Sequence, residues 1–265
     1  MKINLHSFYN HFGCHKPAEG EKFIECYNDF FVMDNKGGIA LLIEPRSIMP
    51  WAYQHMESHW SDFDFVFTHD DELLKKPNAR RILWGGVCNY GDYGAAYGDM
   101  PKTKNISFVS SDKEMCELHI VRKNLAKELN GRVDSMGTFN GGPKVNSEQI
   151  YGEYRFSIAF ENWISDYWFT EKICNCFAFN TVPIYFGARK IGEFFDERGI
   201  IRAESVEDIR RIVDYLQENG EKEYEARLPF IEENRKRVAE YENFERWFFK
   251  TYEKELEDFY GNEYH

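Results

Sequence analysis

The chain has 265 residues, of which 43% are hydrophobic and 17% aromatic, and its formal net charge is −12 at pH 7. This composition excludes a disordered chain, and the length allows one large domain or two small ones, each with a real core. The negative charge argues against a nucleic-acid-binding protein, because contacts with phosphates require a basic surface.

The N-terminal part of the chain alternates strand-like runs with polar segments. Apolar runs predict strands at residues 1–8, 37–44, 63–70 and 80–86, with a short helix at 70–76. A Gly-rich segment without periodicity follows at 85–105 and predicts a long loop. We place a domain boundary at its end, near residues 101–105.

After this loop the alternation begins again. The remaining strands are expected at residues 106–112, 132–137, 156–162, 181–187 and 198–204. Helices are expected at 113–131, 171–180 and 206–220, the first and last of them ended by Gly131 and Gly220. An amphipathic helical tail at 221–260, with Trp247, Phe248 and Phe249, is expected to pack against the body of the protein.

Two successive α/β halves predict the fold class. We expect two Rossmann-like domains facing a cleft, residues 1–101 and 102–265, with the C-terminal helices packing back on the body. In such folds a ligand binds beyond the carboxyl ends of the parallel strands.

The cysteines and the N-terminal residues indicate in which cellular compartment the protein is expected. The six cysteines have no disulfide or zinc-ribbon spacing, and the C-x-C pair Cys174 and Cys176 fits neither a redox motif nor a paired metal site. No run approaches the roughly 20 apolar residues of a membrane span, and no secretory signal is visible. We expect reduced cysteines and a cytoplasmic protein of bacterial or viral type, with no signal or anchor.

The segment FENWISDYWFTEK at residues 160–172 joins the end of a strand to the start of a helix. Glu161 and Asn162 come at the strand end, and Thr170 is expected to cap the helix. The N–H groups and the dipole at a helix N-terminus provide a seat for a phosphate. This corner therefore predicts an anion-binding site within a chain that is negative overall.

The first turn of this helix contains Glu171 and Lys172. Capping explains Glu171, but a cation is disfavoured at the positive end of the helix dipole. A diphosphate opposite Lys172 would supply the partner that capping leaves out. Glu171 would then accept two hydrogen bonds from a ribose or sugar diol.

The run YRFSIAFEN…DYWFTEKICNCFAFNTVPIYFGA resembles the sugar-nucleotide-binding segment of glycosyltransferase family 10, the α1,3/α1,4-fucosyltransferases. The F-E-N, T-E-K and V-P-I elements coincide with the family pattern without an obvious gap. The resemblance implies a GT-B fold, GDP-fucose as donor, held mainly by the C-terminal domain, and inversion at the anomeric carbon without a metal or other cofactor. We therefore predict transfer of L-fucose to a hydroxyl of a glycan acceptor.

The resemblance also implies site residues. Asn162, Glu171 and Lys172 become donor contacts, with Lys172 on the diphosphate, and Glu161 supports the corner. Trp168, which stands where a Tyr is common, is included among the donor-binding residues.

The family also places an Arg, which grips the diphosphate, in the helix after a strand similar to FVSSD at 108–112. Here that helix offers His119 and Arg122, and neither falls at the expected position without a small shift. We choose Arg122 and keep His119 as the alternative.

A base is also required, because inverting transfer must remove a proton from the acceptor hydroxyl. The segment LLIEPRSI is similar to the F-E-S-P segment of the family. Glu44 follows an apolar run and precedes Pro45, so it is fixed and partly desolvated, which raises its basicity. We predict that Glu44 is this base; the alternative is an ordinary Glu in a loop.

Other interpretations remain open. The donor could be another nucleotide sugar, such as a UDP-pentose, a UDP-hexose or GDP-mannose, or the chain could be a non-catalytic nucleotide- or sugar-binding relative. A metal site could use the D-x-D pattern of Asp62 and Asp64, or the pair His55 and His59, although the order is not H-E-x-x-H. The pattern indicates neither the acceptor, whose pocket is expected in loops 9–22 and 85–101, nor the oligomeric state.

Overall fold

A computed structural model describes residues 2–8, 22–83, 100–241 and 244–261. The chain divides into two compact units, Met1–Trp84 together with Glu242–His265, and Gly85–Tyr241. The predicted second domain, residues 102–265, includes the whole tail, whereas the chain returns to the first unit after Tyr241. The predicted acceptor loops lie almost entirely outside the described residues.

The first unit is built on a parallel five-stranded sheet, in which the strands follow one another in chain order. Its strands are β1 (Ile3–His6), β2 (Ile24–Asn28), β3 (Ile39–Leu41), β4 (Phe65–Thr68) and β5 (Ala79–Arg81). Four of these were predicted, but β2 was not, although Ile24, Cys26 and Asn28 alternate as its buried positions. Helix α1 (Pro50–His59) and the short turns η1 (Trp60–Asp62) and η2 (Leu73–Lys75) connect the strands.

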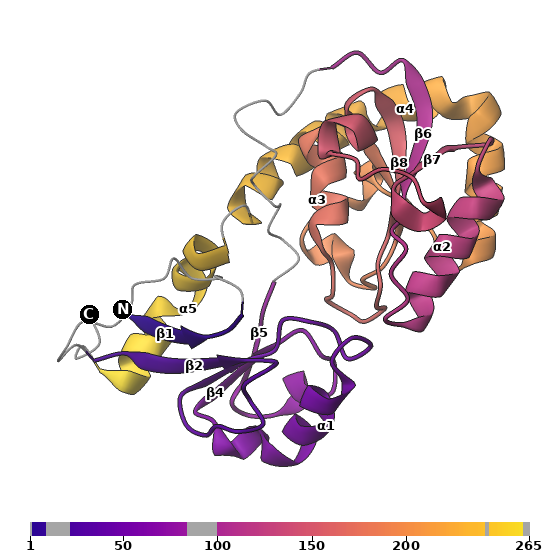
Figure 1. Ribbon diagram of the computed structural model, residues 1–265. Helices are drawn as coiled ribbons and strands as arrows, with labels where there is room; N and C mark the ends of the chain where they lie inside the picture. The colour runs from indigo at the N-terminus through magenta and orange to yellow at the C-terminus, as the bar shows by residue number, and fades with distance from the viewer. Residues whose placement is uncertain (1, 9–21, 84–99, 242–243, 262–265) are drawn as a thin grey trace. The chain divides into compact units, whose positions relative to one another are not determined.

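The last helix, α5 (Phe244–Tyr260), belongs to this first unit and is drawn in yellow in Figure 1. Its buried Phe248 contacts Phe67 of β4 with the ring centroids 4.8 Å apart, and its Tyr252 contacts the same ring at 4.9 Å. The guanidinium of Arg80 pairs with Glu255. The prediction that aromatic residues of the tail pack on the protein's own core is therefore confirmed.

The second unit has a parallel five-stranded sheet in the order β10-β9-β8-β6-β7. The strands are β6 (Lys104–Val109), β7 (Asp134–Met136), β8 (Tyr154–Phe160), β9 (Val182–Phe186) and β10 (Ile201–Arg202). The chain adds β7 on one side of β6 and then crosses to place β8 on the other side. Such a reversal opens a crevice beyond the carboxyl ends of the two central strands, and ligands of α/β sheets bind there.

Three longer helices belong to the second unit, α2 (Glu117–Leu129), α3 (Glu171–Ala178) and α4 (Val206–Tyr241). Figure 1 labels these helices around the sheet of this unit. Short helical turns, η5 (Thr138–Asn140), η6 (Glu148–Gly152), η7 (Ile191–Glu193) and η8 (Glu197–Gly199), complete it. Helix α2 follows β6 and α3 precedes β9, so both start near the carboxyl edge of the sheet.

The prediction that a helix ends at Gly220 is wrong, because α4 continues through this glycine to Tyr241. Gly220 is buried, and a methyl group added there would lie 2.4 Å from Asn105 Oδ1. The amide of Asn105 donates to the carbonyl oxygen of Leu216, one turn earlier, at 2.9 Å. The glycine therefore allows β6 to approach the helix closely, and it does not stop the helix.

Four cysteines fall within the described residues, and all are free thiols: Cys26, Cys116, Cys174 and Cys176. Cys14 and Cys88 lie outside the described residues. Within the described ranges, no helix combines the length and the apolar character that crossing a membrane requires.

Candidate functional site

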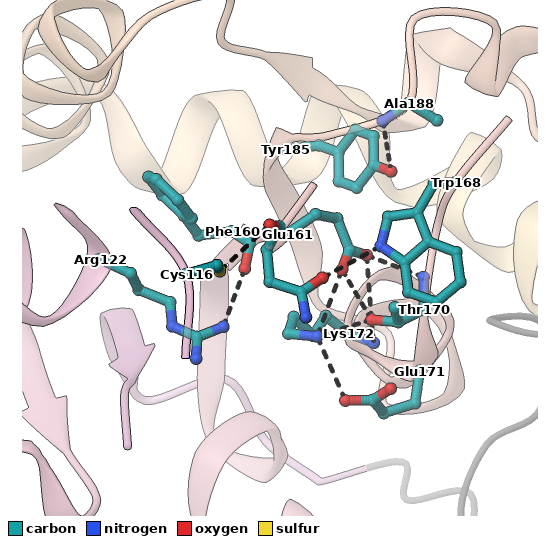
Figure 2. A network of polar contacts seen from close by, with 11 residues as sticks. Cys116, Arg122, Phe160, Glu161, Trp168, Thr170, Glu171, Lys172, Tyr185 and Ala188 are labelled. Carbon is teal, nitrogen blue, oxygen red and sulfur yellow. Dashed lines mark hydrogen bonds and ion pairs between the residues drawn. The ribbon is translucent and has the colours of Figure 1, made fainter. Parts of the chain in front are cut away.

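The predicted donor-binding residues come together in the second unit, at the carboxyl ends of β6 and β8. Glu161 and Asn162 directly follow β8, and α3 begins at Glu171. Helix α2, which follows β6, contributes Arg122. Figure 2 shows Arg122, Glu161 and Glu171 within one network of polar contacts. Strand order brings them together, since β6 and β8 are neighbours although about 50 residues separate them in the chain.

The centre of the network is Glu161, whose side chain is fully buried. Its Oε1 accepts a hydrogen bond from the backbone N–H of Thr170 at 2.8 Å, and the Thr170 hydroxyl lies 2.8 Å from Oε2. Thr170 also caps α3, as predicted, by accepting from the backbone N–H of Lys172 at 3.4 Å. The strand end and the helix start are thus tied together by one carboxylate.

The partner of Lys172 differs from the one that the sequence analysis supplied. Its ammonium lies 3.2 Å from Glu161 Oε2, 2.7 Å from Thr170 Oγ1 and 3.4 Å from Glu171 Oε1. Lys172 therefore has a charge partner within the chain, and its contact with a diphosphate stays a prediction. The buried carboxylate of Glu161 compensates the charge of the ammonium at the helix start.

The charges in this network stabilise one another. Burial acts to lower the pKa of Lys172, but the Glu161 and Glu171 carboxylates outweigh it and raise that pKa above its ordinary value. Burial likewise acts to raise the pKa of Glu171, and the adjacent Lys172 ammonium holds it below its ordinary value. Both groups are therefore charged at neutral pH, so the N-terminus of α3 carries a charged ammonium paired with carboxylates.

Asn162 is oriented by Trp168. The indole Nε1–H of Trp168 donates to Asn162 Oδ1 at 3.1 Å, and the indole is buried, with 3% of the residue exposed. The Cys116 thiol at the start of α2 contacts the carbonyl oxygen of Asn162 at 3.5 Å. The hydrogen bond from Trp168 thus fixes the direction of the Asn162 side chain.

His119 and Arg122, the two residues proposed for the diphosphate, are both buried in α2. Arg122 Nη1 donates to the carbonyl oxygen of Phe160 at 3.3 Å, whereas Arg122 Nε and His119 Nδ1 have no hydrogen-bond partner among the described residues. Burial, assisted by the charge of Arg122, lowers the pKa of His119 to about 4, so its imidazole is neutral at pH 7. Of the two, Arg122 is the one that offers a charge to an anion.

Gly187, which directly follows β9, lies in close contact with Glu161 and Tyr185. A methyl group at this position would lie 2.3 Å from Tyr185 Oη and 2.7 Å from Glu161 Cγ. Tyr185 is buried and its hydroxyl accepts from the backbone N–H of Ala188 at 2.9 Å, so neither neighbour has room to retreat.

We expect Gly187→Ala to lower the free energy of unfolding by about 1–3 kcal/mol, as overpacking of a tight core does. Urea denaturation measures the change. Gly192→Ala is the matched control, because there the added methyl group meets the carboxylate of Glu197, a flexible and half-exposed side chain. Equal stability of the two variants would contradict a tight contact behind Glu161.

Glu44, the predicted base, lies in the first unit just beyond β3 and is partly exposed. Its backbone N–H donates to Asp29 Oδ2 at 3.3 Å, and its carbonyl oxygen accepts from the Tyr53 hydroxyl at 2.6 Å. Asp29 was not among the predicted residues because β2, which it follows, was missed. The alternation of Ile24 and Cys26 with Glu25 and Tyr27, followed by Asp29 just after the strand, was the signal that would have found it.

The residues of the alternative metal sites have other partners. Asp64 Oδ2 accepts from the backbone N–H of Gly38 and from the Tyr260 hydroxyl, each at 2.9 Å, and Asp62 pairs with Lys36. His55 and His59 stack on each other in α1, with ring centroids 4.0 Å apart. In the described part of the chain, no three His, Cys, Asp or Glu side chains are grouped so as to hold a metal ion.

The profile of the family described as "Glycosyltransferase family 10 (fucosyltransferase) C-term" matches residues 100–251, more than half of the chain. The chain belongs to glycosyltransferase family 10. The resemblance drawn from the F-E-N, T-E-K and V-P-I elements is thereby confirmed. The matched residues include the whole network around Glu161.

Two curated proteins resemble parts of this family 10 chain. "Alpha-(1,3)-fucosyltransferase FucT" of Helicobacter pylori is 25% identical over 71 residues, 27% of this chain and 15% of the relative. "GDP-fucose protein O-fucosyltransferase 3" of Gallus gallus is 31% identical over 86 residues, 31% of this chain and 18% of the relative. The chain thus matches less than a fifth of the length of either relative.

Solved structures resemble the chain over a larger share. An α1,3-fucosyltransferase covers 80% of this chain and 70% of its own, with a TM-score of 0.55 at 16% identity. The same kind of enzyme solved with GDP-fucose covers 86% and 76%, with a TM-score of 0.51 at 16% identity. TarM covers 87% of this chain and 54% of its own, with a TM-score of 0.55 at 9% identity. The predicted GT-B type, with two parallel-sheet α/β domains and C-terminal helices, is confirmed.

Proposed function

We propose that this chain is a fucosyltransferase that moves L-fucose from GDP-fucose to a hydroxyl of a glycan acceptor, with inversion at the anomeric carbon. The observation that carries the proposal is the buried Glu161, Thr170 and Lys172 network, which holds a charged ammonium at the N-terminus of α3. Membership of family 10, and a similar fold solved with GDP-fucose, support this donor.

The donor diphosphate would bind between α2 and α3. Lys172, Arg122 and the positive end of the α3 dipole supply positive charge there. The longest contact of the Lys172 ammonium, 3.4 Å to Glu171, joins it to the more exposed of its two carboxylates. We infer that this contact opens when the donor binds, so that Lys172 turns to a phosphate and Glu171 accepts from the ribose hydroxyls. Asn162, held by Trp168, adds a polar contact to the donor.

Transfer would proceed as a single displacement. Glu44 removes the proton from the acceptor hydroxyl while the acceptor oxygen attacks C1 of fucose and the C1–O bond to GDP breaks. The transition state resembles an oxocarbenium ion, and negative charge grows on the leaving phosphate. Once the donor is bound, the cations Lys172 and Arg122 stabilise that charge, and we expect this electrostatic contribution to be the largest one.

A donor panel tests the proposal. The purified protein is incubated with GDP-fucose, GDP-mannose and UDP-sugars, with and without a mixture of glycan acceptors, and the release of nucleoside diphosphate is measured. We expect GDP-fucose to be turned over and to bind more tightly than any UDP-sugar. Turnover of another donor alone would replace the donor assignment, and GDP binding without any turnover would indicate a non-catalytic relative.

Metal independence is a separate prediction. Because Lys172 and Arg122 would neutralise the diphosphate, we expect turnover of GDP-fucose to be unchanged after treatment with EDTA and gel filtration. Rates before and after treatment, and after adding back Mg²⁺ or Mn²⁺, measure this. A strict requirement for either metal would reassign charge neutralisation from the two side chains to the ion.

A further inference from the structure

Asp29 is a buried carboxyl group to which the proposed reaction gives no part. It directly follows β2 and only 1% of it is exposed. Its Oδ2 accepts hydrogen bonds from the backbone N–H groups of Ile43 at 3.0 Å and Glu44 at 3.3 Å. Its Oδ1 has no hydrogen-bond partner among the described residues. Burial raises the pKa of Asp29 to about 7, so keeping a carboxyl here costs folding free energy.

Buried side chains hydrogen-bond both the N–H and the carbonyl oxygen of Glu44. Besides the contact with Asp29, the hydroxyl of Tyr53, from α1, donates to the carbonyl oxygen of Glu44 at 2.6 Å. Tyr53 is fully buried, and its hydroxyl also lies 3.2 Å from His69 Nε2, just after β4. Glu44 lies beyond Leu41, the last residue of β3, so these side chains take the place of strand pairing there.

We propose that Asp29 is a positioning residue for fucosyl transfer: by binding the N–H groups of Ile43 and Glu44 it fixes the backbone from which the Glu44 carboxylate reaches the acceptor hydroxyl. The inference rests on the proposed role of Glu44 as the base. A base must lie within hydrogen-bonding reach of the proton that it removes, and a displacement of about 1 Å can cost roughly a hundredfold in rate.

Two substitutions test whether Asp29 acts by accepting the two backbone N–H groups or only by filling space in the core. Asp29→Ala removes the acceptor of both N–H groups, and we expect it to lower kcat by roughly a hundredfold while leaving KM for GDP-fucose unchanged. Asp29→Asn keeps an acceptor oxygen of the same reach, and we expect it to restore most of kcat. If Asp29→Ala does not fold, Asp29→Ser replaces it, because the serine hydroxyl is too short to reach both groups.

A matched control residue, Asn78, lies at the amino ends of the strands of the same sheet, whereas Asp29 lies at their carboxyl ends. Asn78 comes just before β5 and also binds two backbone groups, the carbonyl oxygens of Trp60 and Phe63. Asn78→Ala should lower the melting temperature without lowering kcat. If it lowers kcat as much as Asp29→Ala does, the effect of Asp29 is one of general stability and the proposal fails.

The closing experiment is a double-mutant cycle on kcat, with residual rates measured over long incubations. If Asp29 acts through Glu44, adding Asp29→Ala to Glu44→Gln lowers the residual rate no further. The proposal is overturned if the effects of Asp29→Ala and Glu44→Gln on kcat multiply in the double variant. It is also overturned if Asp29→Asn is inactive, or if Asp29→Ala has the wild-type kcat. Wild-type turnover in Glu44→Gln alone would instead overturn the proposed role of Glu44, so the two failures are distinguishable.

Discussion

We expect the Glu44→Gln variant to lose transfer of fucose by about 10²- to 10⁴-fold, the range that a positioned general base contributes. Glutamine keeps the size and the hydrogen-bonding capacity of the side chain but cannot take up the acceptor proton. The residues proposed for the donor belong to the second unit, whereas Glu44 belongs to the first. The affinity for GDP, measured by calorimetry, should therefore change little.

The control for this variant is Glu57→Gln, which makes the same chemical change in the same unit. Glu57 is exposed in α1 and pairs with Arg46, so its loss should leave turnover near the wild-type rate. Turnover retained in Glu44→Gln would remove Glu44 from the role of base. A parallel loss of GDP affinity would indicate that the substitution had damaged the fold.

The second large effect is expected from Lys172→Met, which should both weaken GDP binding and destabilise the protein. Removing the ammonium leaves Glu161 fully buried and without its charge partner. Breaking such a buried pair typically costs about 3–5 kcal/mol in the free energy of unfolding. Losing one charged contact with the diphosphate should weaken GDP binding by roughly ten- to a hundredfold. Urea denaturation and calorimetry measure the two effects separately.

The double variant Glu161→Gln with Lys172→Met separates these two roles. With both charges removed, glutamine can still accept from the Thr170 N–H, so most of the stability should return. GDP binding should stay weak, because the cation is still absent. If the double variant recovers the affinity as well, Lys172 serves the fold alone. Lys190→Met, which removes an exposed lysine paired with Asp166, controls for the loss of a surface charge.

Local patterns identified most of the elements and the family. Apolar runs predicted nine of the ten strands in the described part of the chain, since a strand with one or two buried faces has a recognisable pattern. The strand that was missed, β2, contains the polar residues Glu25 and Asn28, whose partners Asn4 and Ser7 lie on β1 or just after it. The F-E-N and T-E-K elements marked the corner between β8 and α3 before any contact was known.

Glycine in a helical run was the least reliable signal. A glycine that ends a helix and a glycine that lets a strand approach look the same in a sequence. Gly131 follows α2 with a φ of +95°, the left-handed backbone that ends helices, whereas Gly220 lies within α4 against Asn105. The difference depends on whether a neighbouring strand lies against the helix at that residue.

The sequence alone determined the α/β class, the family and the set of residues around the start of α3, because each depends on short-range pattern or motif. Only the tertiary structure decided which groups pair. The order of strands places the buried Glu161 beneath Lys172 and brings α2, after β6, beside the end of β8. It also sets Asp29 against Glu44 and returns α5 to the first unit. A local period or motif marks the residues but does not state which of their side chains pair, because these contacts form only when the strands pair and the side chains lose water.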